Sequence, residues 1–391
     1  MNPANLDILF TNIGRGHPFY LDGIIEVLSI REQANCVSSQ RDVFDISTGL
    51  SLAAWRLARW LYRRGSSPGM VGSVYRRIRS ENDYNRPGAM LNLMAAHLRR
   101  KYADDSNQLI VAHPILVACL RGRTNLVYQH GELVTPSEAV VHGAEKILVP
   151  TDDAARPFIQ VGYSPDDVIV SGLFIEPALV NLAADAYDAR LKRLASNQPL
   201  TGAFFSSGAE PKHHVEQIVA AVGSVIRCGG KAIIFAQCGG RLARAIREGL
   251  AKDSVQLSEI GSGDSFPAKP ESAVLVCYSN RREIDVLTAG SFEQFDYLVS
   301  PSHERTNWAV GLGLPMFVIG PPIGPFAPLN RDLLLRTQVA CELDSAYRAC
   351  DLGDIVASLR AESELAAMAA RGWQRYPIDG FGKAVDFLLN N

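Results

Sequence analysis

One histidine stands directly after the first apolar segment of the chain, where acid–base chemistry would be expected. Residues 13–18 contain Gly14, Gly16 and His17. The glycines allow a tight turn and a close approach of the backbone to a ligand. A free imidazole titrates at about 6.5, so His17 is suited to take a proton from a hydroxyl nucleophile near neutral pH. The same spacing fits a structural turn in which His17 caps the next helix.

A denser group of polar residues follows the apolar segment 297–300. Its members are Ser302, His303, Glu304, Arg305, Thr306 and Asn307. Such side chains are costly to bury without partners, so this succession is unusual for a structural turn. The pattern indicates a ligand-binding loop.

Three further loops contribute candidates for binding phosphate or nucleotide. Residues 206–210 place small side chains and free N–H groups before a helix, where a diphosphate could bind, although a simple turn with a serine cap fits equally. The loop at 237–241 would let the backbone approach a base or ribose. A proline-rich loop leads to an asparagine at the start of a helix. The candidates in these three loops are Ser206, Ser207, Gly208, Gln237 and Asn330. Gly14 and Gly16, beside His17, are further candidates for contact with the ligand.

The elements that must position these loops follow a βα pattern. Short apolar runs alternate with stretches of helical periodicity, which is typical of parallel sheets covered by helices. The predicted strands lie at 6–12, 108–112, 125–129, 146–150, 168–171, 202–206, 231–236, 273–278, 297–300 and 316–319. The fold class is therefore α/β, with two Rossmann-like domains facing each other across a cleft. Ligands of such sheets lie at the carboxyl ends of the strands, where the candidates fall.

Length and composition favour two ordinary globular domains. A chain of 391 residues exceeds one usual core, and its net charge of −2 provides no global field for nucleic acid. We expect an N-terminal domain at 1–180, a linker at 181–200 and a C-terminal domain at 201–391, whose last helix is free to pack back on the first domain. Seven scattered cysteines without a C-x-x-C motif predict reduced core thiols.

Taken together, these loops resemble the GT-B glycosyltransferases, in the branch with monogalactosyldiacylglycerol synthases and the lipid-II-forming N-acetylglucosaminyltransferase. Residues 14–17 are similar to that branch's G-x-G-H segment, and residues 111–114 to its strand ending in His-Pro. Residues 149–172 are similar to one of its junctions, and 311–315 with Asn330 to its donor-binding element. The likeness covers most of the chain.

The donor-binding element also departs from the resembled family. Counting back from Gly313, the family's acidic residue, which is expected to hold the donor ribose, falls on Trp308. Glu304 and Asn307 are candidates to take its place. Two serines stand at 206–207 where the family has a double glycine.

The resemblance implies inverting transfer from a nucleotide-sugar, namely a UDP-sugar, to a hydroxyl acceptor bound by the first domain, without a metal or other cofactor. His17 would deprotonate the acceptor, and helix N-termini near Ser207 and Thr306 would stabilise the departing diphosphate. The chain contains no D-x-D motif, and the adjacent His213 and His214 are poorly placed to share a metal.

Residues 50–64 predict where the chain could meet a membrane. They combine Trp55, Leu57 and Trp60 with four arginines, which is typical of a basic helix on an anionic membrane surface. A partly buried helix with extended arginines fits equally. Because the N-terminus has no signal-peptide pattern, we expect a cytoplasmic protein, with peripheral contact at the inner face of the membrane and through it access to a lipid-linked acceptor.

Two other functions remain open. A UDP-N-acetylglucosamine 2-epimerase on the same fold predicts further acidic and basic residues near His113 and His130 and no separate acceptor. A non-catalytic glycosyltransferase-like protein that binds nucleotide or glycan is favoured if the indole of Trp308 fills the donor pocket instead of pointing into the core.

Overall fold

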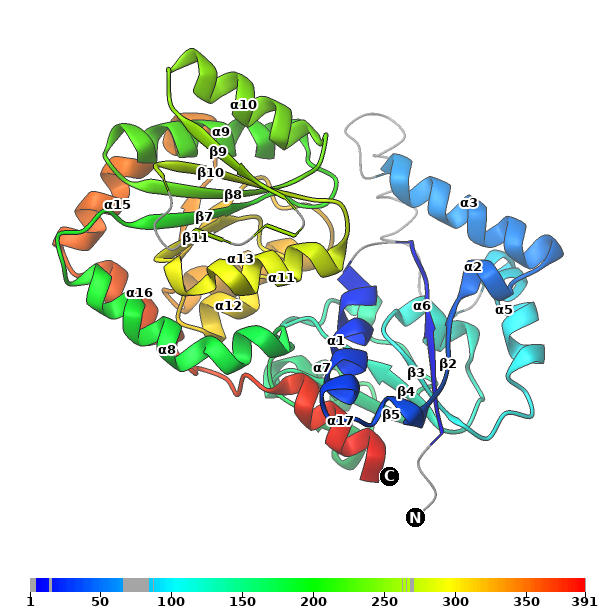
Figure 1. Ribbon diagram of the computed structural model, residues 1–391. Coiled ribbons are helices and arrows are strands. Elements are labelled where there is room, and N and C mark those ends of the chain that lie inside the picture. The colour runs from blue at the N-terminus through cyan, green and yellow to red at the C-terminus, as the bar shows by residue number, and fades with distance from the viewer. Residues whose placement is uncertain are drawn as a thin grey trace. The chain divides into compact units, whose positions relative to one another are not determined.

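The computed structural model describes residues 5–13, 16–65, 84–86, 88–261, 263–264, 266–267 and 271–390, without the side chains of residues 16, 17 and 62–65. The chain divides into two compact units (Figure 1). Unit 1 comprises Met1–Pro177 with Pro377–Asn391, and unit 2 comprises Ala178–Tyr376.

Unit 1 is a parallel sheet of six strands in the order β2-β1-β3-β4-β5-β6. Its strands are β1 (Leu6–Phe10), β2 (Val37–Asp42), β3 (Gln108–Val111), β4 (Leu126–Gln129), β5 (Lys146–Val149) and β6 (Val168–Val170). Its helices are α1 (Gly16–Ile30), α2 (Val43–Ile46), α3 (Gly49–Gly65), α5 (Ala89–Lys101), α6 (Pro114–Cys119), α7 (Asp152–Gln160) and α17 (Gly380–Asn390).

The last helix of the chain belongs to unit 1 and packs beside α1 (Figure 1). The ring of Phe381 on α17 contacts Phe19 and Phe174 with centroid distances of 5.7 and 5.2 Å. It lies against Gly23 so closely that any Cβ at that position would overlap the ring. The Pro377 carbonyl accepts a 2.7 Å hydrogen bond from the Leu173 N–H, which fixes the point where the chain re-enters unit 1.

Unit 2 is a second parallel sheet, with the strand order β13-β12-β11-β7-β8-β10-β9. Its strands are β7 (Thr201–Phe205), β8 (Lys231–Gln237), β9 (Leu257–Ile260), β10 (Ala273–Tyr278), β11 (Tyr297–Ser300), β12 (Met316–Ile319) and β13 (Ala340–Leu343). Its helices are α8 (Pro177–Leu194), α9 (Lys212–Arg227), α10 (Arg241–Lys252), α11 (Arg281–Ser291), α12 (Thr306–Gly311), α13 (Phe326–Arg336), α14 (Ala346–Ala349), α15 (Leu352–Ala361) and α16 (Glu364–Gly372). From β7 the chain first builds one side of the sheet and then crosses to β11 on the other, so the strand order reverses between these two neighbours.

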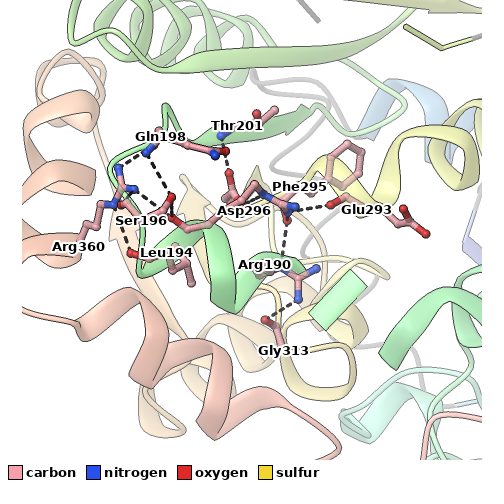
Figure 2. Close-up of polar contacts among 11 residues, drawn as sticks. Arg190, Leu194, Ser196, Gln198, Thr201, Glu293, Phe295, Asp296, Gly313 and Arg360 are labelled. Carbon is pink, nitrogen blue, oxygen red and sulfur yellow. Dashed lines mark hydrogen bonds and ion pairs between the residues drawn. The ribbon is translucent and has the colours of Figure 1, made fainter. Parts of the chain in front are cut away.

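Helix α8 fills most of the predicted linker at 181–200, and the buried side chain of Arg190 holds it within unit 2 (Figure 2). Arg190 is fully buried and donates to the carbonyl oxygens of Phe295, Leu312 and Gly313 at 2.9–3.0 Å. Burial lowers the pKa of Arg190 to about 10, although the nearby Asp296 opposes this effect. The prediction of a linker here is wrong because these contacts make the segment part of the unit 2 core.

A second arginine, Arg193, extends this network to the start of the sheet. Its Nε lies 2.7 Å from Oδ1 of Asp296, whose Oδ2 accepts a 2.7 Å hydrogen bond from the Thr201 N–H. On α15, Arg360 donates to the Gln198 carbonyl at 2.9 Å and also to that of Ser196. The turn between α8 and β7 is therefore held on both sides.

All seven cysteines are free, and only Cys36 and Cys119 are buried. The prediction of core thiols is wrong for the exposed Cys228, Cys238 and Cys350. Within the described ranges, no helix combines the length and apolarity needed to cross a bilayer.

We expect Arg190→Met to lower the free energy of unfolding by about 3–5 kcal/mol, as measured by chemical denaturation. The substitution removes a buried cation next to Asp296 and leaves three carbonyl oxygens without their donor. Arg156→Met is the control, because Arg156 forms an exposed ion pair with Asp153 and should change stability by less than about 0.5 kcal/mol. Equal midpoints for both variants would contradict this role of Arg190.

Candidate functional site

The candidate residues of unit 2 gather at the carboxyl ends of β7 and β11. These strands are hydrogen-bonded neighbours, with Val299 opposite Phe204, so the loops 206–211 and 301–305 leave the same edge of the sheet side by side. The strand order reverses at this pair. In open α/β sheets that reversal is where a ligand crevice forms.

The loop after β11 is anchored by aromatic side chains beneath it. The guanidinium of Arg305 lies 4.1 Å from the ring centroid of Phe205 and 5.3 Å from that of Trp308, a cation–π arrangement. Trp308 is 2% exposed and packs edge-on against Phe205 and Phe292. The indole at the position of the resembled family's acid is thus part of the core of unit 2.

The charges of this loop are balanced by arginines from two elements. The carboxylate of Glu304 lies 3.2 Å from Nη1 of Arg305 and 3.8 Å from Nη1 of Arg281 on α11. Burial raises the pKa of Glu304, but the charges of Arg305 and Arg281 outweigh it and hold that pKa below its ordinary value. Glu304 is therefore ionised and engaged with cations.

Several buried polar atoms around this edge have no hydrogen-bond partner among the described residues. They are Ser206 Oγ, His213 Nε2, His214 Nδ1, Arg305 Nε, Thr306 Oγ1 and Asn330 Oδ1. Buried polar groups in native proteins are nearly always hydrogen-bonded. Such a concentration of unpaired donors and acceptors at one sheet edge is what a polar ligand site requires.

The loop after β7 ends on a carboxylate that occupies a helix terminus. Oε2 of Glu210 accepts hydrogen bonds from the N–H groups of Arg241 and Leu242 at 2.5 and 3.1 Å, at the start of α10. The same loop meets its own helix, α9, only at Lys212, with Pro211 before it. The helix N-terminus expected near Ser207 therefore begins further along the chain, at Lys212, and the N-terminus of α10 already holds an anionic group.

The first turn of α9 reaches across the end of β11 to the loop after β12. His214 is fully buried, and its Nε2 lies 3.0 Å from the Pro321 carbonyl oxygen. Gln217 pairs with both polar groups of Gly320, donating to its carbonyl at 2.7 Å and accepting from its N–H at 3.0 Å. Burial lowers the pKa of His214 to about 4, with smaller contributions from His213 and His303 in the same direction, while the Pro321 carbonyl acts in the opposite direction.

Several predicted site residues make structural contacts. Ser302 Oγ donates to the Ala327 carbonyl at 2.8 Å, and Asn330 Nδ2 donates to the Ser302 carbonyl at 3.2 Å, which ties the loop after β11 to α13. Asn330 lies inside α13 instead of at its start. Asn307 is buried within α12.

The remaining unit 2 candidates line the loops after β7 and β8. Ser207 is partly buried and accepts a 2.9 Å backbone hydrogen bond from Glu210, and Gly208 is exposed. Gln237 is the last residue of β8, and its carbonyl accepts a 2.8 Å hydrogen bond from the Gly240 N–H. Burial lowers the pKa of His303 in the neighbouring loop.

The candidates near the N-terminus lie in unit 1. Gly16 and His17 form the first two positions of α1, Gly14 falls outside the described residues, and the side chain of His17 is likewise outside them. The assignment of His17 as a base stays a prediction. Nδ1 of His113 accepts the Ile115 N–H as the N-cap of α6.

His130 in unit 1 forms contacts within the core. Its ring lies within 3.3 Å of the Tyr128 hydroxyl, and its Nε2 lies 3.1 and 3.0 Å from the Val134 carbonyl and the Thr135 hydroxyl. In the part of the chain that the structure describes, no group of three or more His, Cys, Asp or Glu side chains could hold a metal ion.

No family model and no curated protein sequence matches the chain. Solved structures do match over nearly its whole length. UDP-GlcNAc 2-epimerase from Neisseria meningitidis bound to UDP-GlcNAc is 11% identical, with a TM-score of 0.56 and coverage of 99% of this chain and 100% of that one. UGT71G1 from Medicago truncatula complexed with UDP-glucose is 11% identical, with a TM-score of 0.51 and 98% coverage of both chains.

A third similar structure is WaaG, a glycosyltransferase involved in lipopolysaccharide biosynthesis. It is 12% identical, with a TM-score of 0.50 and coverage of 99% of this chain and 100% of that one. Together these likenesses show that the chain has the α/β fold of the GT-B type, which confirms the predicted pair of Rossmann-like domains. The more specific resemblance to the monogalactosyldiacylglycerol synthase branch stays a prediction.

Sequence reasoning missed three residues of this edge, namely Glu210, His214 and Arg281. The position of His214 could have been recognised from the sequence. A polar residue in the first turn of the helix after β7 lies at the same sheet edge as the loop that precedes the helix. Glu210 and Arg281 carried no such signal, since their partners Leu242 and Glu304 are distant in the sequence.

The lowered pKa of His214 predicts a pH dependence of stability. Between pH 6.5 and about 4 the unfolded chain binds a proton that the folded chain does not, so the free energy of unfolding falls by about 3 kcal/mol as the pH decreases through this window. His214→Gln removes this titration. We therefore expect the stability of wild type relative to this variant to decrease by about that amount between pH 7 and pH 4, as measured by urea denaturation, whereas a constant difference would contradict the burial of a neutral imidazole.

Proposed function

We propose that the chain is a glycosyltransferase that moves a sugar, with inversion, from a UDP-sugar bound at the carboxyl edge of β7 and β11 to a hydroxyl acceptor. The observation that carries the proposal is the set of buried, unpaired polar atoms at that edge, next to the guanidinium of Arg305. A UDP-sugar presents hydroxyls, a diphosphate and a base, which match this mixture of donors and acceptors.

Arg305 and Thr306 supply what the departing diphosphate needs. Arginine binds phosphate oxygens through several N–H groups, and Nε of Arg305 is unpaired. A donor that is already in place when negative charge develops on the leaving group lowers the barrier without reorganisation. His17 would take the proton of the acceptor hydroxyl, as the resemblance to the G-x-G-H segment implies.

The structure bears on both alternative functions. An indole at position 308 that filled the donor pocket would favour a non-catalytic protein. The side chain of Trp308 lies in the core of unit 2 instead, which supports a catalytic function. An epimerase would use acidic and basic groups around His113 and His130. Nδ1 of His113 accepts a helix-cap hydrogen bond, and the ring of His130 lies within hydrogen-bond distance of the hydroxyls of Tyr128 and Thr135. The N. meningitidis structure is itself that of an epimerase bound to UDP-GlcNAc, so both functions share the same class of ligand.

Thr306→Val tests the ligand site, because it replaces an unpaired buried hydroxyl with a methyl group. We expect unchanged or slightly raised stability and a UDP affinity about 3–10-fold weaker by calorimetry, which corresponds to one hydrogen bond. Thr337→Val is the matched control, since its hydroxyl donates to the Leu333 carbonyl in α13, so that variant should lose some stability and keep its affinity. Equal UDP affinity in wild type and Thr306→Val would count against the site.

Product analysis separates transfer from epimerisation. With UDP-glucose or UDP-N-acetylglucosamine and a set of hydroxyl acceptors, a transferase releases UDP only when an acceptor is present. An epimerase converts UDP-N-acetylglucosamine alone into a stereoisomer that proton NMR resolves. The second result would replace the proposal with the epimerase function.

We also propose that helix α3 places unit 1 on an anionic membrane surface, which would give access to a lipid-linked acceptor. The helix is fixed to α5 (Figure 1), because Ser51 Oγ and Trp55 Nε1 both donate to the Met94 carbonyl. Its outward positions carry large apolar side chains at helical spacing, namely Leu50 (73% exposed), Leu57 (44%) and Trp60 (49%).

The charge beside this stripe suits an anionic lipid surface. Arg56 is exposed next to the stripe, and Arg59 lies over the ring of Phe44. On the neighbouring α5, Met90 and Leu93 are also exposed. An apolar stripe bordered by arginines is the arrangement of helices that lie in the membrane interface.

The double variant Leu50→Gln/Leu57→Gln tests this surface by flotation with phosphatidylcholine vesicles that contain or lack phosphatidylglycerol. We expect wild type to float with the anionic vesicles and the variant to bind them about tenfold more weakly. Ile30→Gln/Val286→Gln is the control, because both residues are equally exposed apolar side chains on other helices. Flotation that is absent in wild type, or equal in the two double variants, would refute the membrane contact.

A further inference from the structure

The hydrogen bond of His214 defines which of its nitrogens carries the proton. A carbonyl oxygen only accepts, so Nε2, which lies 3.0 Å from the Pro321 carbonyl oxygen, must be the protonated nitrogen. A neutral imidazole holds a single proton. Nδ1 therefore presents a bare lone pair, and it has no partner among the described residues.

The surroundings of His214 keep this lone pair in place. Gln217, three residues further along α9, holds the helix against Gly320 through two hydrogen bonds. The ring of His213 stands edge-on to that of His214 at a centroid distance of 4.5 Å. Because His214 is fully buried, rotation of its ring would break the bond to Pro321 without a replacement bond to bulk water.

The position of His214 belongs to the ligand edge. Its helix follows β7, and its hydrogen-bond partner follows β12, while β11 lies between those two strands. The side chain thus spans the end of the strand from which the loop 301–305 departs. Ser206 Oγ, after β7, and Thr306 Oγ1, on the first residue of α12 after β11, are also buried without partners among the described residues.

An unprotonated ring nitrogen discriminates between ligand groups by whether they donate or only accept hydrogen bonds. It accepts a hydrogen bond from a hydroxyl or N–H, and it repels a phosphate oxygen, which is itself only an acceptor at neutral pH. We propose that His214 is a specificity-determining residue that accepts a hydrogen bond from a neutral O–H or N–H of the nucleotide-sugar and makes no contact with its phosphates. This inference rests on the proposed function and adds to it the chemical group that this residue recognises.

Two substitutions test the roles of the two ring nitrogens of His214 separately. In His214→Asn the side-chain oxygen takes the place of Nδ1, so the acceptor is kept and the bond to Pro321 is lost. In His214→Gln the amide N–H takes the place of Nε2, so the bond to Pro321 is kept and the acceptor is lost. Calorimetry with UDP-glucose, UDP-N-acetylglucosamine and inorganic pyrophosphate gives the affinities, and thermal unfolding shows that each variant is folded.

We expect His214→Gln to bind the UDP-sugars about 3–10-fold more weakly than wild type. Its affinity for pyrophosphate should be unchanged. Its stability at neutral pH should be at least that of His214→Asn, because it keeps the bond to Pro321. His214→Asn should keep the affinity for the UDP-sugars. Unchanged UDP-sugar affinity in His214→Gln, or an equal loss for pyrophosphate, would overturn the inference while leaving the proposed function intact. Failure of wild type to bind any UDP-sugar would overturn both.

Discussion

The buried guanidinium of Arg190 determines where the candidate site can lie. It binds the carbonyl of Phe295 just before β11 and that of Gly313 just after α12, so both ends of the segment that carries the polar loop are held by one side chain (Figure 2). Gly313 adopts a positive φ of 59°, and a Cβ there would lie 2.7 Å from the Ala369 carbonyl oxygen. With its ends fixed in this way, the loop can hold donors in place before a ligand arrives, which is how a binding site avoids the cost of reorganisation.

The same edge of the sheet keeps its charges in closely balanced groups. Glu304 is engaged by Arg305 and Arg281, while Glu210 is directed away to the start of α10. Burial keeps His214 neutral. A diphosphate placed here would meet the guanidinium groups of Arg305 and Arg281, which are paired with the carboxylates of Glu304 and Asp285. A sugar or base would meet neutral donors and acceptors.

The strands in the middle of each sheet could be predicted from the sequence, and most edge strands could not. A central strand such as Ala273–Tyr278 is buried for most of its length and forms an uninterrupted apolar run. The unpredicted strands β2, β9 and β13 all lie at sheet edges, where one side is unpaired, and Val37–Asp42 has the largely polar sequence VSSQRD. Within the site, the polar loop was recognisable from its residue types. The core position of Trp308 and the lone pair of His214 depend on contacts between distant segments, which no local pattern reveals.

The central claim is that the edge shared by β7 and β11 binds a nucleotide-sugar. Hydrogen–deuterium exchange of the full chain with and without UDP-glucose tests it most directly, because the backbone of the two loops should be protected by the ligand. We expect slower exchange in peptides that cover residues 205–214 and 300–308, with no change in peptides from α15 or α16. Protection confined to other segments, or none at saturating ligand, would contradict it.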